Sequence, residues 1–259
     1  MKATAKALVV GLGEVGGALA EILDRAFGAV LRQDLEPIAA DAPVGIMHIC
    51  IPFKEAESFN RAVVEYARKF QPGLIIVNST VLPGTTRAIA DATRLPTAYS
   101  PVRGKHVRMV ADLLKYRKYV AGVTAEAAQA AAQHFSAAGM KVGRMDKPET
   151  LELAKLGETT YFGLQIAFAQ ELNRYAERVG GDYDEAIEFF DEVAFLPPVR
   201  YFPGFIGGHC VMPNIELLRR IAGSPLLEAI VDSNRRRAEE LAATSNGDAA
   251  QRVKRSGEA

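Results

Sequence analysis

The glycine-rich segment at residues 11–16 constrains the fold more than any other feature of the chain. It follows directly on an apolar run and opens an amphipathic stretch, which is the order strand, tight turn, helix. In a dinucleotide-binding turn the first glycine permits the bend, the second lets a pyrophosphate approach the backbone, and the third lets the helix pack on the strand. We therefore predict a dinucleotide contact along the whole segment: Gly11, Leu12, Gly13, Glu14, Val15 and Gly16.

The pattern continues as an alternation of short apolar runs and amphipathic stretches. Strands are expected near residues 7–12, 29–34, 45–51, 73–79, 96–100 and 118–123, with helices at 14–26, 55–70 and 85–93. Strands that are apolar on both faces indicate a parallel sheet covered on both sides. We predict an α/β, doubly wound, parallel-sheet Rossmann domain over residues 1–147.

Two residues at expected strand ends extend the cofactor site. Asp34 closes the second strand, where a carboxylate accepts hydrogen bonds from the adenosine ribose and repels a 2′-phosphate. This favours NAD over NADP, although the neighbouring Arg32 leaves NADP open. Pro52 follows the strand whose end borders the nicotinamide in doubly wound folds, so we include it among the cofactor contacts.

After residue 147 the alternation of strands and helices gives way to helical patterns alone. One helical pattern runs from 149 to 179 and is closed by Gly180 and Gly181, and further helices are expected at 184–194, 215–221 and 226–241. These predict an all-helical domain over residues 148–243. Residues 244–259 are polar and without periodicity, which predicts a disordered tail.

Composition restricts the partners. Lys plus Arg equals Asp plus Glu at 31 each, so no bulk field recruits nucleic acid or a membrane surface. No apolar run is long enough to cross a membrane, and the amino-terminal run is broken by glycines, unlike a secretion signal. The two cysteines, Cys50 and Cys210, have no metal-ligand or disulfide-framework spacing, which fits a reducing cytoplasm and no metal.

Cys210 lies in the segment "FPGFIGGHCVMPN", whose glycines let backbone and ligand come close. It is a candidate nucleophile. A small buried structural thiol is the alternative. Cys50 lies in a predicted strand and is expected to be a core thiol.

Four segments together resemble the UDP-glucose/GDP-mannose dehydrogenase family: "VVGLGEVGGALA", "NSTVLPGTTRAIA", "ELAKLGETTYFGLQIAFAQELNRYAE" and "FPGFIGGHCVMPN". The resemblance implies an NAD-dependent enzyme that oxidises a sugar or nucleotide-sugar alcohol. It implies that Lys155 stabilises oxyanions, that Thr80 lies beside the reacting carbon and the cofactor, and that Cys210 attacks the aldehyde intermediate to give a thiohemiacetal. Chemistry agrees, because a cation stabilises an alkoxide and a thiolate adds to an aldehyde.

A homodimer through the helix at 149–179 is also expected, because that helix is apolar on more than one side. The apolar residues on which this expectation rests are Leu151, Leu153, Leu156, Phe162, Leu164, Ile166 and Phe168.

Three positions depart from the family pattern. Val102 stands where the family has a glutamate, Thr159 replaces an asparagine and Asn214 replaces an aspartate, so thioester hydrolysis is the step most affected. Thr159 and Asn214 stay candidate catalytic residues. We also expect the chain to be a short form without the family's C-terminal UDP-binding domain. Two alternatives stay open: an enzyme resembling the two-domain 3-hydroxy acid dehydrogenases, and a non-catalytic NAD-binding regulatory subunit.

Overall fold

The computed structural model describes residues 7–28, 30–36, 38–39, 43–104, 106–190, 193, 201–208 and 210–256. The chain divides into two compact units, Met1–Lys155 and Leu156–Ala259. Each unit is described here by itself.

The first unit is built on a seven-stranded sheet in the order β2-β1-β3-β4-β5-β6-β7. The strands are β1 Ala7–Val10, β2 Leu31–Gln33, β3 Ile46–Ile49, β4 Leu74–Val77, β5 Thr97–Tyr99, β6 Lys118–Gly122 and β7 Val142–Arg144. Each of the six strands expected from the sequence is present, and β7 is an addition. The predicted doubly wound α/β class is confirmed.

The expectation of a wholly parallel sheet was wrong at one edge. Strands β1 to β5 are parallel, but β6 pairs antiparallel with β5, and β7 is parallel to β6. The connection between β5 and β6 contains the 3₁₀ turn His106–Arg108 and the helix α4, Met109–Lys115. With Ala98 opposite Gly122 and Tyr99 opposite Ala121 in this antiparallel pair, strand β6 starts at the edge where β5 ends.

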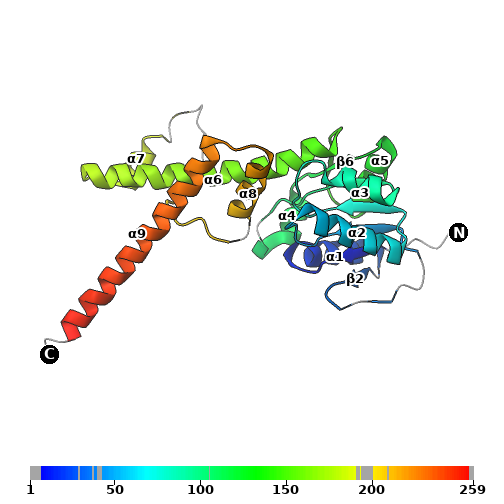
Figure 1. Ribbon diagram of the computed structural model, residues 1–259, viewed down its shortest axis with the longest axis horizontal. Helices are drawn as coiled ribbons and strands as arrows, with labels where there is room; N and C mark the ends of the chain where they lie inside the picture. Colours follow the sequence, from blue (N-terminus) through cyan, green and yellow to red (C-terminus); the bar gives the residue numbers. More distant parts are fainter. Residues whose placement is uncertain are drawn as a thin grey trace. The chain divides into compact units, whose positions relative to one another are not determined.

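Helices cover both faces of this sheet (Figure 1). Helices α1 (Glu14–Phe27), α4 and α5 (Ala125–Ala137) share one core cluster, to which they contribute Leu23, Leu113 and Phe135. Helices α2 (Ala56–Phe70) and α3 (Thr85–Thr93) contribute to the other. Because residues of β1, β3, β4, β5 and β6 alternate between the two clusters, these strands are apolar on both faces, as predicted.

The first unit ends later than the predicted boundary at residue 147, and includes the first turns of the long helix α6, Pro148–Val179. Two residues of these turns hold the helix to the sheet domain. Leu151 is buried in the core with residues of α2 and α3. Glu152 is fully buried and accepts hydrogen bonds at the amino terminus of α3. Such contacts across sequence distance do not follow from the local pattern.

The second unit consists of the rest of α6 with α7 (Tyr183–Glu188), α8 (Val211–Ile221) and α9 (Pro225–Ser256). Its core is formed by Ala167, Ile206, Val211, Ile215, Leu227 and Ile230. Gly180 has φ +70°, a left-handed conformation that ends α6 where predicted. Helix α7 is shorter than the helix expected over 184–194, of which residues 191, 192 and 194 lie outside the described residues.

The prediction of a disordered tail from residue 244 was wrong up to Ser256, because α9 runs through to that residue. The segment contains two alanines with glutamine, arginine and lysine, which are strong helix formers, and it extends an existing helix without a new nucleus. Within the part of the chain that the structure describes, no helix combines the length and apolar character needed to cross a membrane.

Candidate nucleotide-binding and active site

The glycine turn lies where the order of the sheet reverses. Strand β1 is flanked by β2 on one side and β3 on the other, so the loops after β1 and β3 open a crevice at the carboxyl ends of the strands. The backbone N–H of Gly11 donates to the Gln33 carbonyl at 2.8 Å, and the N–H of Cys50 donates to the Val10 carbonyl at 2.8 Å. These bonds hold the start of both loops in register with the sheet.

Each glycine of the turn meets a different steric demand. Gly11 has φ +88°, and a Cβ there would lie 2.9 Å from the backbone of Cys50. A Cβ on Gly16 would lie 1.7 Å from the Gly11 carbonyl oxygen, so only glycine lets α1 approach the turn. Gly13 is different: it is exposed, and a Cβ there would meet no atom within 4 Å. This open space at the start of α1 fits the approach of a pyrophosphate to the backbone.

Asp34 lies exposed directly after β2, and a buried side chain shapes its loop. The Gln33 amide nitrogen donates to the carbonyl of Asp34 and, at 3.0 Å, to that of Glu36. Arg32, which left NADP open on the sequence, forms an ion pair with Asp24. The Arg32 partner lowers the pKa of Asp24, chiefly through their hydrogen bond. The Arg32 guanidinium is thus already paired with Asp24, and this pairing competes with the binding of a 2′-phosphate.

Pro52 and Thr80 lie on neighbouring loops that one serine ties together. The Ser79 hydroxyl donates to the Ile51 carbonyl at 2.6 Å, which joins the loop after β4 to the loop after β3. Pro52 and Thr80 each adjoin a partner of this bond. Pro52 is exposed and Thr80 is half-buried at this edge of the sheet. The structure thus places both predicted cofactor contacts at the carboxyl edge that also carries the glycine turn.

Glu152 anchors the segment that carries Thr80. Its carboxylate accepts from the N–H of Gly84 at 2.7 Å, and from the N–H and hydroxyl of Thr86 at 2.9 and 2.6 Å. Burial raises the pKa of Glu152, while these hydrogen bonds act in the opposite direction. Lys155, half-buried, follows one turn later on the same helix. Glu152 was not predicted as a site residue, although its place three residues before Lys155 in a quoted motif was a usable signal.

The loop after β5 has no acid at the position where the family has one. Val102 is buried in the core cluster with Met109 and Leu113. Arg103 lies over the Tyr119 ring at 5.3 Å and donates to the Arg117 carbonyl at 2.8 Å. The side chain at position 102 is a valine and therefore cannot exchange a proton.

A second group of predicted residues gathers in the helical unit. Cys210 is half-buried and is the N-cap of α8, so its thiol lies at the positive end of a helix dipole. The buried Asn214, one turn into that helix, donates from its amide to the Thr159 hydroxyl at 2.9 Å. Thr159 in turn donates to the Leu156 carbonyl at 3.0 Å. Two of the three positions that depart from the family pattern, Thr159 and Asn214, are thus hydrogen-bonded to each other.

Two buried amides, which the sequence analysis also missed, hold the glycine loop before Cys210. Asn234 of α9 accepts from the N–H of Ile206 at 2.7 Å and donates to the carbonyl of the same residue at 3.1 Å. Gln170 of α6 donates to the Gly204 carbonyl at 2.7 Å. His209 lies outside the described residues. No sequence signal marks these amides, because each contact spans more than 25 residues.

The predicted site residues thus form two groups, one in each unit. Together they define the class of protein: a doubly wound domain with a dinucleotide-type glycine turn at its switch point, joined by a long helix to a helical domain. Residues 149–236 match the central domain of the UDP-glucose/GDP-mannose dehydrogenase family. This match contains the third and fourth of the quoted sequence segments and supports the resemblance to this family.

Individual relatives agree with this assignment. A UDP-N-acetyl-D-mannosamine dehydrogenase of Methanocaldococcus jannaschii is 26% identical over 199 residues, 71% of this chain and 46% of the relative. The chain therefore spans about half the length of this curated relative. The fold matches that of a UDP-D-ManNAc dehydrogenase of Pyrococcus horikoshii with TM-score 0.81 and 21% identity, over 96% of this chain and 72% of that one.

A smaller enzyme shares the fold as well. A 3-hydroxyisobutyrate dehydrogenase of Mycobacterium tuberculosis matches with TM-score 0.69 and 16% identity, over 93% of this chain and 94% of that chain. At this identity the likeness shows the fold alone.

Proposed function

We propose that this chain binds NAD and oxidises the alcohol of a sugar or nucleotide sugar. One observation carries the proposal: a glycine cradle that fits a pyrophosphate stands at the switch point of a chain whose residues 149–236 match the family's central domain. When bound, NAD would supply the hydride acceptor for this oxidation. The remaining roles belong to side chains of the protein.

Asp34 accepts from the adenosine ribose hydroxyls in this proposal, and the N–H groups at the start of α1 receive the pyrophosphate. NAD is favoured over NADP because the Asp34 carboxylate repels a 2′-phosphate. The Arg32–Asp24 ion pair supports the same preference. Pro52 and Thr80 line the edge of the sheet beyond the glycine turn.

Lys155 stabilises the alkoxide as the hydride leaves, by donating to the developing negative charge. The Cys210 thiol then loses its proton and the thiolate adds to the aldehyde carbon. The resulting alkoxide oxygen takes up that proton, which gives the thiohemiacetal. The place of Cys210 at the amino terminus of α8 supports formation of the thiolate. Burial has the opposite effect on Cys50, where it raises the pKa of the thiol to about 12, against a smaller effect of Lys118.

Hydrolysis of an acyl-enzyme at Cys210 lacks a carboxylate at the family's positions. Asn214 cannot act as a base, and its amide is engaged by Thr159. Loss of a placed general base costs roughly 10²–10⁴ in rate. We therefore propose that oxidation stops at the two-electron stage or stalls as the acyl-enzyme.

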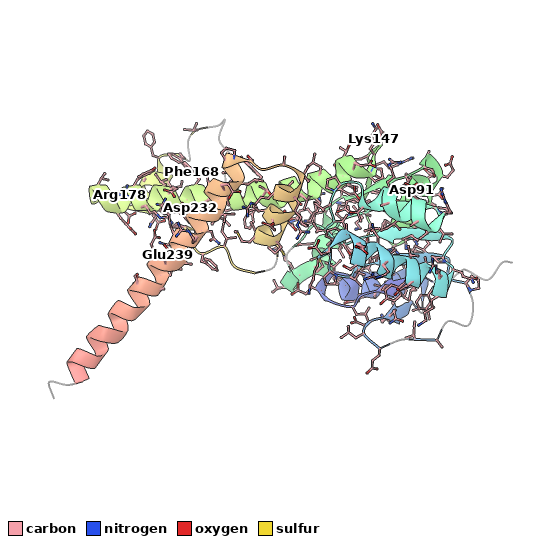
Figure 2. The ribbon with its side chains drawn as sticks, in the orientation of Figure 1. Asp91, Lys147, Phe168, Arg178, Asp232 and Glu239 are labelled. Atoms are coloured by element: carbon pink, nitrogen blue, oxygen red, sulfur yellow. The ribbon has the colours of Figure 1, made fainter. Side chains whose placement is uncertain are left out.

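We further propose that the chain forms a homodimer through α6. Two of the seven apolar residues on which the sequence expectation rested, Leu151 and Leu156, are buried within the chain. An exposed stripe remains: Tyr161, Phe168 and Tyr175 recur every seven residues and are each more than half exposed. Figure 2 marks Phe168 and Arg178 on this helix. An exposed apolar stripe of this kind favours burial against a second copy.

A second candidate function is oxidation of a small 3-hydroxy acid. The fold shared with the M. tuberculosis 3-hydroxyisobutyrate dehydrogenase, over 93% of this chain and 94% of that chain, allows this reading without specifying a substrate. The cysteine-containing loop held by Asn234 and Gln170 favours the sugar substrate instead, because a 3-hydroxy acid oxidised once needs no nucleophilic thiol.

The test is formation of NADH, followed by absorbance, with purified protein and nucleotide sugars, sugar phosphates and 3-hydroxy acids, beside the Cys210→Ser variant. Oxidation of a sugar compound supports the proposal, and a second NADH per enzyme that is lost in Cys210→Ser supports the role of the thiol. Oxidation of a 3-hydroxy acid that is insensitive to Cys210→Ser supports the second candidate. NAD binding without turnover of any substrate would instead indicate a regulatory subunit.

A further inference from the structure

Lys118, the first residue of β6, lies at the carboxyl edge of the parallel strands. Because β6 is antiparallel to β5, with Ala98 opposite Gly122 and Tyr99 opposite Ala121, the register carries Lys118 past the end of β5. Its side chain is almost completely buried there. A buried lysine needs partners for its charge.

The ammonium group has three acceptors at hydrogen-bond distance. Its Nζ donates to the carbonyl oxygen of Ser100 at 2.6 Å, to that of Pro101 at 3.0 Å and to Asn78 Oδ1 at 3.3 Å. It also lies 5.0 Å from the centre of the Phe135 ring, within reach of a cation–π interaction. An ammonium offers three N–H donors and a neutral amine only two, so this arrangement suits the charged form.

These acceptors belong to the two segments that border the proposed cofactor site. Asn78 is the first residue after β4. It is followed by Ser79, whose hydroxyl donates to the loop after β3, and then by Thr80. Ser100 and Pro101 begin the loop after β5. Asn78 is further held by His48, whose ring nitrogen lies 3.3 Å from the amide nitrogen. One cation thus connects both segments.

The charged and titratable groups around Lys118 come from several elements. Burial lowers the pKa of Lys118 to about 7; Cys50 acts against this, while the cations Lys155 and Arg103 act in the same direction.

Two histidines complete these surroundings. His48 of β3 contacts His134 of α5 at 3.0 Å, and burial lowers the pKa of both, that of His134 to about 4. The two histidines and the Cys50 thiol are therefore neutral from about pH 6 to pH 8.5, where Lys118 changes charge.

We infer that Lys118 is a positioning residue whose ammonium form holds the segments after β4 and β5 in the arrangement that binds NAD. This inference rests on the proposed function. Deprotonation removes one N–H donor and releases one of the three acceptors, so the two segments lose their shared anchor. Cofactor affinity then falls as the pH rises.

The test compares wild type with Lys118→Arg, Lys118→Met and a control, Lys147→Met, which changes an exposed lysine labelled in Figure 2. Calorimetry gives the Kd for NAD at about pH 6, 7 and 8.5. We expect the wild-type and control Kd to rise about tenfold over this range, as loss of one hydrogen bond to a charged group allows. Lys118→Arg keeps its charge, so its Kd stays flat. Lys118→Met binds about tenfold more weakly than wild type at pH 6, also without pH dependence.

Amide hydrogen exchange of segment 100–104 provides a second readout that needs no cofactor. After correction for the intrinsic exchange rate, we expect protection to fall in Lys118→Met and to be retained in Lys118→Arg. Unchanged protection in Lys118→Met would overturn the inference whether or not NAD binds, and so would a wild-type Kd that is flat across the pH range. A wild type that binds no NAD, yet loses protection in Lys118→Met, would overturn the proposed function and with it the cofactor role of Lys118, while retaining the anchor.

Discussion

Replacing Glu152 by alanine tests how α6 is attached to the sheet domain. The variant removes the acceptor of three hydrogen bonds, two from backbone N–H groups at the start of α3 and one from the Thr86 hydroxyl. Loss of a helix cap costs about 0.5–2 kcal/mol, and each buried donor left unsatisfied about 1–3 kcal/mol. Relief of the buried charge offsets part of this, so we expect a net loss of about 2–4 kcal/mol at neutral pH.

The pH dependence of this loss has a definite sign. Because the pKa of Glu152 is raised in the folded protein, its contribution to stability is fully present below the unfolded-state value of 4.5 and is lost as the pH rises through the folded value. The alanine variant should therefore lose more stability relative to wild type in mild acid than at neutral pH. Urea unfolding at both pH values measures this.

The control is Glu65→Ala, which changes an exposed glutamate of α2 and should shift stability by less than about 0.5 kcal/mol. A Glu152→Ala loss no larger than that of the control would refute the reasoning. So would a loss that grows from acid to neutral pH, because it would mean that the carboxylate is stabilised by folding.

Three further predictions concern the glycine turn, the thiols and the assembly. Gly16→Ala should lower the free energy of unfolding by more than about 3 kcal/mol, because its Cβ would collide with a carbonyl oxygen 1.7 Å away. Gly13→Ala should change stability by less than about 0.5 kcal/mol and should weaken only the binding of NAD. Thermal melts measure the stability of each variant, and calorimetry measures its affinity for NAD. Iodoacetamide should alkylate Cys210 faster than Cys50, whose pKa is raised to about 12, and equal rates by peptide mass mapping would contradict this. Light scattering should give a dimer mass that Phe168→Ser weakens; a wild-type monomer at micromolar concentration would disprove the interface.

The local pattern predicted much of the sheet domain. Repeating apolar runs and the glycine turn predicted six strands and helices α1, α2 and α3 to within a few residues. Strand β7 and helix α5 were not predicted. β7 has only three residues, one of them glycine, and α5 is so rich in alanine that its buried and exposed faces differ little in hydropathy.

The side-chain network of the site could not be predicted, because its bonds join residues distant in sequence. Lys118 lies in a predicted strand and carries no local signal, and only the antiparallel pairing of β6 with β5 brings it to Ser100 and Pro101. Thr159 and Asn214 were each identified as departures from a family pattern. Their mutual hydrogen bond depends on the packing of α8 against α6 and has no local signal.

The most direct test of the account is calorimetric titration of NAD and NADP into the intact protein and into its Asp34→Ala variant. We expect NAD to bind the wild type and NADP to bind more weakly, because the exposed Asp34 carboxylate receives the ribose and repels a 2′-phosphate. The variant should bind NAD more weakly and lose most of the discrimination. Absence of binding by either nucleotide to the wild type would contradict the account.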